Sequence, residues 1–258
     1  MNKALTFLML LAFANCGRAA VIAQYDFDGN TDDSIRGAGY AGVVTGTTSY
    51  TANNKAFHFD GSTYIKAASV LGGYSTATVS SWVRFDSFGS PWDNSTIVKD
   101  DWNAGGPIHF GTSQTKLAIQ TAPGGYAGVF STQTLSTGQW YHLAFTFNGT
   151  SSNPFLKLYV NGDEVGSRVI DPGALSSSPS GIMAFGAKLN IFGNPIDPAD
   201  QNLKGDMDGL VFFNTDLSGS EIKAISNAGV GAVVPEPSTI SMLAIGLAGF
   251  ALNRRRRR

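Results

Sequence analysis

The sequence predicts an all-β fold, a β-sandwich of two antiparallel sheets with one short helix near the end of the domain. Three observations lead to this prediction. Charged residues are only 14% of the chain, whereas glycine (31) and phenylalanine (17) are abundant, as is typical of short strands joined by turns. Apolar residues recur with a period of two in segments rich in β-branched and aromatic side chains. Asn-Gly and Asp-Gly pairs, which supply the positive φ of tight hairpins, separate these segments.

Alternation of apolar and polar residues locates the expected strands and the helix. Trp82 and Trp140 lie inside two of the alternating segments, so we expect both in the core. The helix is expected near 217–225, where Ser218 and Glu221 have the spacing of a capping box. The strands are expected at 22–27, 56–59, 64–67, 77–85, 116–119, 140–147, 155–160 and 210–213.

The N-terminal residues 1–19 are predicted to be a secretory signal peptide. Lys3 gives a positive start, residues 4–14 are apolar, and small residues surround a cut after Ala19, although Val21-Ile22-Ala23 also fits a cleavage site. A buried helix is the alternative. If Cys16 leaves with this segment, the mature chain has no cysteine. Stability must then come from packing, with or without a metal, rather than from disulfides.

Residues 232–258 end the chain in three parts. A proline-flanked glutamate comes first, in Pro235-Glu236-Pro237. An apolar stretch, 238–252, follows, and five arginines from Arg254 and Arg255 onward finish the chain. As a helix the stretch measures about 22 Å, shorter than the roughly 30 Å hydrocarbon core of a bilayer. The arginines favour a cytoplasmic position for the last residues.

This tripartite ending resembles the PEP-CTERM sorting signal of Gram-negative bacteria. The resemblance implies that exosortase, a membrane protease-transpeptidase, recognises the chain and cuts it near the Pro-Glu-Pro motif. The protein would be exported through the inner membrane and held there transiently by 238–252. It would end at the cell surface or outside the cell, in bacteria that make exopolysaccharide and biofilm. An ordinary tail anchor is the alternative.

The charge between the two ends excludes nucleic acid as a partner. Residues 20–231 contain eleven Lys and Arg against eighteen Asp and Glu, which is a net charge of −7. Affinity for nucleic acid depends on neutralising phosphates with basic side chains.

Seven motifs in one order extend over about 200 residues of the same region. They are Tyr25-Asp-Phe-Asp-Gly-Asn30, Ala56-Phe-His-Phe-Asp-Gly61, Thr78-Val-Ser-Ser-Trp-Val83, Trp140-Tyr-His-Leu-Ala-Phe-Thr-Phe147, Leu158-Tyr-Val-Asn-Gly162, Gly205-Asp-Met-Asp-Gly-Leu-Val211 and Leu217-Ser-Gly-Ser-Glu-Ile222. The series resembles the laminin-G-like, concanavalin A-like lectin/glucanase jelly roll, placed as one domain at 20–231. The fold hosts lectins, glucanases, adhesion modules and structural domains, so it does not define a ligand.

Hydrolysis of glycosides is not expected. It needs two carboxyl groups about 5–10 Å apart across the scissile bond, and the glucanases that the chain resembles carry them on one strand. The chain has only three glutamates, Glu164, Glu221 and Glu236, all outside the expected cleft. We expect no strand to carry acids at i and i+2 that point into a groove. The sequence therefore predicts no catalytic residues and a protein that is not an enzyme.

A structural calcium ion is expected from the Asp-Gly pairs. Calcium prefers carboxylate and carbonyl oxygens from glycine-containing loops. The resemblance implies Asp28 and Asp208 as side-chain ligands that tie the first strand to the last, with Asp60 as a loop contributor and Asp26 as a substitute. The alternative is that these aspartates form turns with their own backbone.

Carbohydrate binding is the leading prediction for function. Trp92 and Trp102 lie in a polar stretch rich in Gly, Pro and Asp, and Tyr126 follows Pro123-Gly-Gly125. Large rings in such loops are available to stack on sugars, unless they fold back over a sheet edge. The expected ligand is extracellular polysaccharide or another glycan. The alternatives are a structural or adhesive module that binds proteins, and a divergent glucanase whose acids come from loops.

Overall fold

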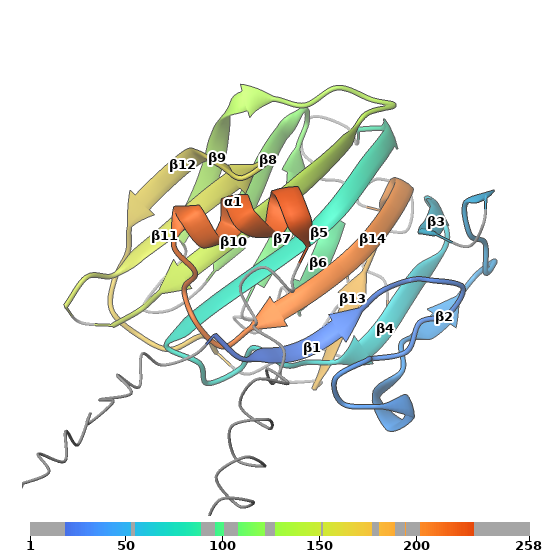
Figure 1. The fold of residues 1–258 in the computed structure, drawn as a ribbon, viewed down its shortest axis with the longest axis horizontal. Coiled ribbons are helices and arrows are strands. Elements are labelled where there is room, and N and C mark those ends of the chain that lie inside the picture. The colour runs from blue at the N-terminus through green and yellow to red at the C-terminus, as the bar shows by residue number, and fades with distance from the viewer. Residues whose placement is uncertain are drawn as a thin grey trace, which may run out of the picture.

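The chain folds into a sandwich of two antiparallel sheets with one helix on an outer face (Figure 1). This confirms the predicted fold class. A computed structural model describes the residues 19–52, 55–88, 96–100, 108–121, 127–150, 152–176, 181–188, 194 and 202–229.

The first sheet, as far as the structure describes it, has seven strands in the order β1-β14-β5-β10-β11-β12, with β3 also beside β14. These strands are β1 (Val21–Tyr25), β3 (Phe57–Asp60), β5 (Thr76–Ser87), β10 (Trp140–Asn148), β11 (Phe155–Val160), β12 (Asp163–Val169) and β14 (Lys204–Phe213).

The second sheet, within the same described ranges, has the order β2-β4-β13-β6-β7-β8-β9. Its strands are β2 (Val43–Thr45), β4 (Tyr64–Ala68), β6 (Thr96–Asp100), β7 (Ile108–Ser113), β8 (Lys116–Thr121), β9 (Ala127–Thr134) and β13 (Ile182–Phe185). A 3-10 turn, η1 (Ala38–Tyr40), precedes β2.

Strand β14 is flanked by two strands on one of its edges. Its first half pairs with β3 from Lys204 to Met207, and its second half pairs with β1 from Leu210 to Phe213. Asp208 lies between these two ladders, while on the other edge it pairs with Trp82 of β5. The register with β5 shifts directly after Asp208, where Gly209 adopts a positive φ of 55°. The notch between β1 and β3 therefore leaves this point of β14 open.

The core fills the space between the two sheets. Alternate residues of the first sheet point inward, and their aromatic rings meet those of the second sheet. Phe145 of β10 lies 5.1 Å from Phe110 of β7, and Tyr25 of β1 lies 4.8 Å from Phe185 of β13, both measured between ring centroids. All four rings are buried.

The helix α1 (Gly219–Ala228) covers part of the outer face of the first sheet. The predicted capping box is confirmed, because the Ser218 hydroxyl accepts from the Glu221 backbone N–H and the Glu221 carboxylate accepts from the Ser218 N–H at 2.8 Å. Ile222 and Ile225 pack in a second apolar cluster on the strands below. Figure 1 shows α1 lying across β10 and β11.

The expectation that Trp140 lies in the core is wrong. Its indole is 40% exposed, whereas Tyr141 and Leu143 of the same strand point inward. Period-two alternation defines two faces of a strand without saying which is inside, and Trp140 shares the outer face with Ala144. Trp82 also lies on this face and is half-buried.

Candidate functional site

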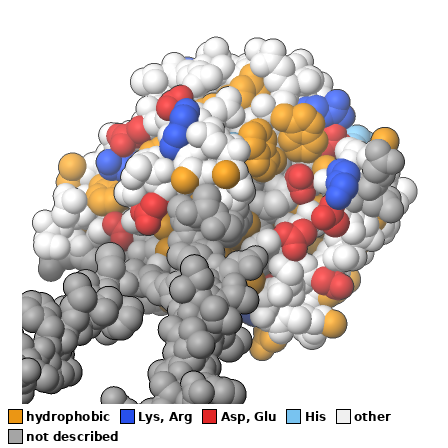
Figure 2. All heavy atoms as spheres, viewed as in Figure 1, with side chains coloured by type: hydrophobic (Ala, Val, Ile, Leu, Met, Phe, Trp, Pro, Cys, Tyr) orange, Lys and Arg blue, Asp and Glu red, His pale blue; other side chains and the backbone are white. Residues whose placement is uncertain are grey.

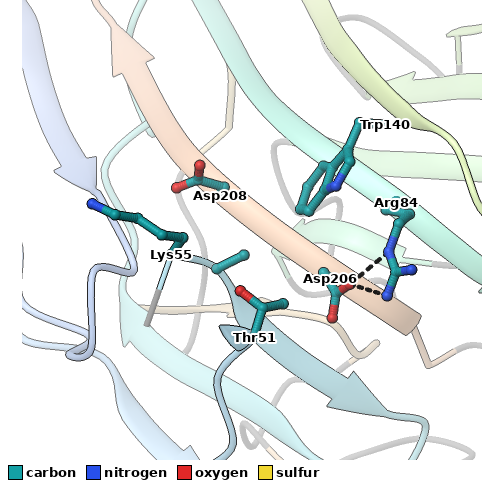
Figure 3. A pocket seen from close by; sticks show the side chains of 7 residues that line it. Thr51, Lys55, Arg84, Trp140, Asp206 and Asp208 are labelled. Atoms are coloured by element: carbon teal, nitrogen blue, oxygen red, sulfur yellow. Dashed lines mark hydrogen bonds and ion pairs between the residues drawn. The ribbon is translucent and has the colours of Figure 1, made fainter. Parts of the chain in front are cut away.

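A pocket of about 470 Å³ opens on the outer face of the first sheet. It is lined by side chains from β5, β10 and β14 and from the segment before β3 (Figure 3). The lining residues are Thr51, Lys55, Ala56, Arg84, Trp140, Asp206 and Asp208.

Strand register brings three of the lining residues and the neighbouring His58 into one row. His58 of β3 is opposite Asp206 of β14, which is opposite Arg84 of β5, which is opposite Trp140 of β10. Residues directly opposite in antiparallel strands have neighbouring side chains on the same face. The row therefore crosses four strands on the outer face.

Asp206 is the buried anchor of this row, with 1% of its surface exposed. The Arg84 Nε–H donates to its Oδ2 at 2.7 Å, and an Arg84 terminal nitrogen also forms an ion pair with Oδ2. The His58 Nδ1 lies 2.8 Å from its Oδ1. A buried carboxylate needs such partners because desolvation is otherwise costly. These contacts hold the partly exposed guanidinium in place.

Trp140 supplies an apolar wall beside the charged groups. Figure 3 shows its indole pointing toward the space between Asp208 and the Arg84–Asp206 pair. Figure 2 shows exposed hydrophobic side chains next to acidic and basic ones on this face. An exposed ring beside hydrogen-bonding groups is suited to an amphipathic ligand.

Asp208 is the second carboxylate of the pocket and lies in the notch of β14. It is half-buried, and it forms no ion pair within the ranges that the structure describes. Burial and the negative charges of Asp28 and Asp26 together raise the pKa of Asp208 to about 6, although the backbone N–H of Gly209 and the charge of Lys55 act in the opposite direction.

Asp206 and Asp208 overturn the expectation that no strand carries acids at i and i+2 toward a groove. Both face the pocket, because the pairing of β14 with β5 is regular from Gly205 to Asp208. The sequence alone does not show that these two aspartates face a groove, because the groove is formed by side chains of other strands. The signal was present in Asp206-Met-Asp208, whose apolar middle residue points into the core.

His142 of β10 is a buried titratable residue close to Trp140 in sequence. It is 1% exposed, and no hydrogen-bond partner for Nδ1 or Nε2 occurs within the described ranges. Its ring contacts that of Trp82 at a centroid distance of 5.5 Å. Burial lowers the pKa of His142 to about 4.

The predicted calcium ligands are brought together only in part. Asp28 lies close enough to Asp208 to raise its pKa, and its own carboxylate is 3.3 Å from the Lys55 ammonium. Asp60 is opposite Lys204, four residues along β14 from Asp208, which is about 13 Å at the rise of a strand. No cluster of three or more His, Cys, Asp or Glu residues that could hold a metal ion occurs among the described residues.

The Asp60 carboxylate forms hydrogen bonds with the residues of the turn that follows it. Its Oδ1 accepts from the Ser62 and Thr63 backbone N–H groups at 2.8 and 2.7 Å. Burial raises the pKa of Asp60, but these hydrogen bonds outweigh it and lower the pKa to about 2. Asp60 thus has the contacts of a turn-forming aspartate.

The other predicted site residues lie outside the described residues. They are the candidate sugar-binding residues Trp92, Trp102 and Tyr126 and the sorting residues Pro235, Glu236, Pro237, Arg254 and Arg255. The described part of the chain contains no helix long and apolar enough to span a membrane.

Together the fold and the pocket define a class, the jelly-roll domains that present a polar and aromatic site on a rigid sheet. The model of the concanavalin A-like lectin/glucanases superfamily matches residues 59–223, more than half of the chain, and the chain belongs to this superfamily. The PEP-CTERM protein-sorting motif matches residues 233–258, which marks a surface protein sorted by exosortase. No curated protein sequence matches the chain.

Solved structures share the fold at low sequence identity. Domain 4 of AbnA, a GH43 extracellular arabinanase from Geobacillus stearothermophilus in complex with arabinotriose, has a TM-score of 0.64 and 21% identity over 81% of this chain and 99% of that chain. A botulinum neurotoxin type C structure, from work on its interaction with two ganglioside molecules, has a TM-score of 0.60 and 16% identity over 81% of this chain and 51% of that chain. The binding domain of botulinum neurotoxin DC in complex with rat synaptotagmin II has a TM-score of 0.59 and 15% identity over 81% of this chain and 51% of that chain.

Proposed function

We propose that the chain is a non-catalytic carbohydrate-binding protein of the cell surface, which binds glycan in the pocket beside Trp140. One observation carries the proposal: an indole that is 40% exposed stands next to a guanidinium fixed by a buried carboxylate. Sugars present an apolar face of C–H groups and an edge of hydroxyls, so a ring and a fixed hydrogen-bond donor match both. The similar arabinanase domain in complex with arabinotriose supports a sugar ligand for this fold.

Binding is favoured over hydrolysis because Asp206 is occupied. Both of its carboxylate oxygens interact with Arg84 or His58, and almost none of its surface is exposed. A nucleophile or general base must approach the sugar carbon or a water molecule. Asp206 in this arrangement orients Arg84 instead.

The proposed setting is the bacterial surface. The sorting motif supports export through the inner membrane, processing by exosortase and release to the surface or the medium, with exopolysaccharide as the partner. A structural calcium ion at Asp28 and Asp208 remains part of the proposal. The ion would link the segment after β1 to β14 and would not take part in chemistry.

The test is binding of the purified full chain to exopolysaccharide from the bacterium that makes it, and to a panel of plant and bacterial polysaccharides, by affinity electrophoresis. We expect Trp140→Ala to abolish retardation. The control is Phe130→Ala, which removes another exposed ring, 49% exposed, from β9 of the other sheet.

A parallel variant tests the loop residues. If Trp92→Ala with Trp102→Ala abolishes binding and Trp140→Ala does not, the glycan site is in the loops and not in this pocket. If glycan binding persists in all of these variants, both candidate sites are rejected. If the folded wild-type chain binds no glycan, the carbohydrate function is rejected. The adhesive alternative would then lead, with the complex between the similar toxin domain and synaptotagmin as its support.

A further inference from the structure

The charges around the pocket limit the kind of glycan that it accepts, if the proposed function holds. The pocket has two cationic side chains, and each already faces carboxylates. Arg84 contacts Asp206 and lies 3.5 Å from Asp86, and the Lys55 ammonium lies 3.3 Å from Asp28. The positive charge of each cation is therefore already balanced by a carboxylate of the protein, although Arg84 is partly exposed and keeps N–H groups for a ligand.

When no calcium ion is bound, as in EDTA, Asp208 leaves a negative charge at the other end of the pocket. It forms no ion pair within the described ranges, and the charges of Asp28 and Asp26 at this position are opposed only in part by that of Lys55. An anionic sugar that stacked on Trp140 would bring its carboxylate into this group without a free counter-charge. Like charges at close range oppose binding, most strongly at low salt.

Uncharged hydroxyl groups are not subject to this charge repulsion. A hydroxyl donates to the Asp208 carboxylate and accepts from an N–H of Arg84, because it has both functions. Figure 3 shows these two groups on either side of the space that the Trp140 indole faces. Hydrogen bonds to charged partners are stronger than neutral ones and give such a site its selectivity.

The charge of the whole domain acts in the same direction. Residues 20–231 carry eleven Lys and Arg against eighteen Asp and Glu, a net of −7. A polyanion is repelled before it reaches the pocket, and this repulsion decreases as salt increases.

We propose that the pocket selects uncharged polysaccharides, read through neighbouring hydroxyls by Arg84 and Asp208, and rejects polysaccharides rich in uronic acids. The inference deepens the proposed function and depends on it. It names a ligand class by charge and does not name a sugar.

The experiment compares dissociation constants of the purified full chain for neutral probes (arabinan, galactan and a mixed-linkage β-glucan) and acidic probes (alginate and polygalacturonate), at low salt with EDTA. We expect at least tenfold weaker binding of every acidic probe than of the best neutral one. Asp208→Asn should reduce the ratio of the acidic to the neutral dissociation constants by several-fold. The matched control is Glu164→Gln, which removes a carboxylate of similar charge on β12 and should leave the ratio unchanged.

The outcomes separate the two proposals. Binding of an acidic probe as tight as that of the neutral ones, and lost in Trp140→Ala, overturns the inference and leaves the carbohydrate function standing. An unchanged ratio in Asp208→Asn also overturns it. No binding of any probe by the folded chain rejects the carbohydrate function and the inference with it.

Discussion

Replacement of His142 by phenylalanine should stabilise the protein, and the gain should increase as the pH falls. His142 is 1% exposed, and neither ring nitrogen has a partner among the described residues. An unsatisfied buried polar atom costs about 1–3 kcal/mol. Phenylalanine keeps a planar ring against Trp82 and removes both nitrogens. We expect His142→Phe to raise the free energy of unfolding by about 1 kcal/mol near pH 7.5, after allowance for the larger ring.

The pH dependence follows from the pKa of His142. Burial lowers it from 6.5 to about 4, so below pH 6.5 the unfolded chain takes up a proton that the folded chain does not. Stability associated with this group is thus complete above pH 6.5 and is lost as the pH falls toward 4. At 1.36 kcal/mol per pH unit, the loss at pH 5 is about 2 kcal/mol. His142→Phe has no such loss, so its advantage should increase by that amount between pH 7.5 and pH 5.

Asp208 contributes a pH dependence of stability with the opposite sign to that of His142, and the comparison must remove this contribution. Its folded pKa of about 6 is above the ordinary value of 3.8, so its contribution to stability is full below 3.8 and is lost as the pH rises through 6. Both proteins contain Asp208, so the difference between them isolates His142.

The assay is urea unfolding of wild type and variant at four pH values between 7.5 and 5. His142→Gln is the control, because it retains a buried polar group without a titration in this range. Relative to wild type it should show the pH trend without the gain at pH 7.5. A difference between wild type and His142→Phe that stays constant with pH would show that His142 is protonated in the folded chain, or bonded, and would refute the reasoning.

Three further predictions concern the pocket, the helix and the metal. Arg84→Met should lower the free energy of unfolding by about 2 kcal/mol, which is less than for a fully buried ion pair because Arg84 is partly exposed. In thermal unfolding this corresponds to a melting temperature lower by about 4–8 °C. Adding Asp206→Leu to Arg84→Met should restore much of the lost stability, and no recovery in the double variant would contradict the ion-pair argument. Ser218→Ala should cost about 1 kcal/mol in urea unfolding because α1 loses its capping box, and a loss under a few tenths would mean that the cap adds little. Calcium should raise the melting temperature of wild type and not of Asp208→Asn, and an equal rise in both would exclude Asp208 as a ligand.

The sequence predicted the fold well because its signals are local. Alternating segments located strands such as β5 and β10, and Ser218 with Glu221 located the start of α1. Strands with weaker alternation were missed, among them β7, where His109, Gly111 and Thr112 are buried together with the apolar residues. In a strand of the second sheet, the polar content hides the period-two pattern.

The pocket was not predicted, because strand register creates it. His58, Asp206, Arg84 and Trp140 are up to 148 residues apart in sequence and become neighbours only through the pairing of β3, β14, β5 and β10. Periodicity identifies which side chains share a face of one strand, but it does not identify the partner strand. The polar surroundings of Trp92 and Trp102 in the sequence therefore predicted a site in the loops, and the alternating segment around Trp140 predicted a core position.

The position of β14 has a consequence for how the domain forms during synthesis. Among the strands that the structure describes, β14 is the last to be made, yet β1, β3 and β5, which are made more than a hundred residues earlier, all pair with it. Until residue 213 emerges, the first sheet lacks the strand that joins β1 and β3 to β5, and Tyr25 of β1 lacks its ring contact with Phe212. Contacts between such distant segments form slowly because long loops must close first. The chain should therefore stay incompletely folded, and open to chaperones and proteases, until nearly all of the domain has been exported.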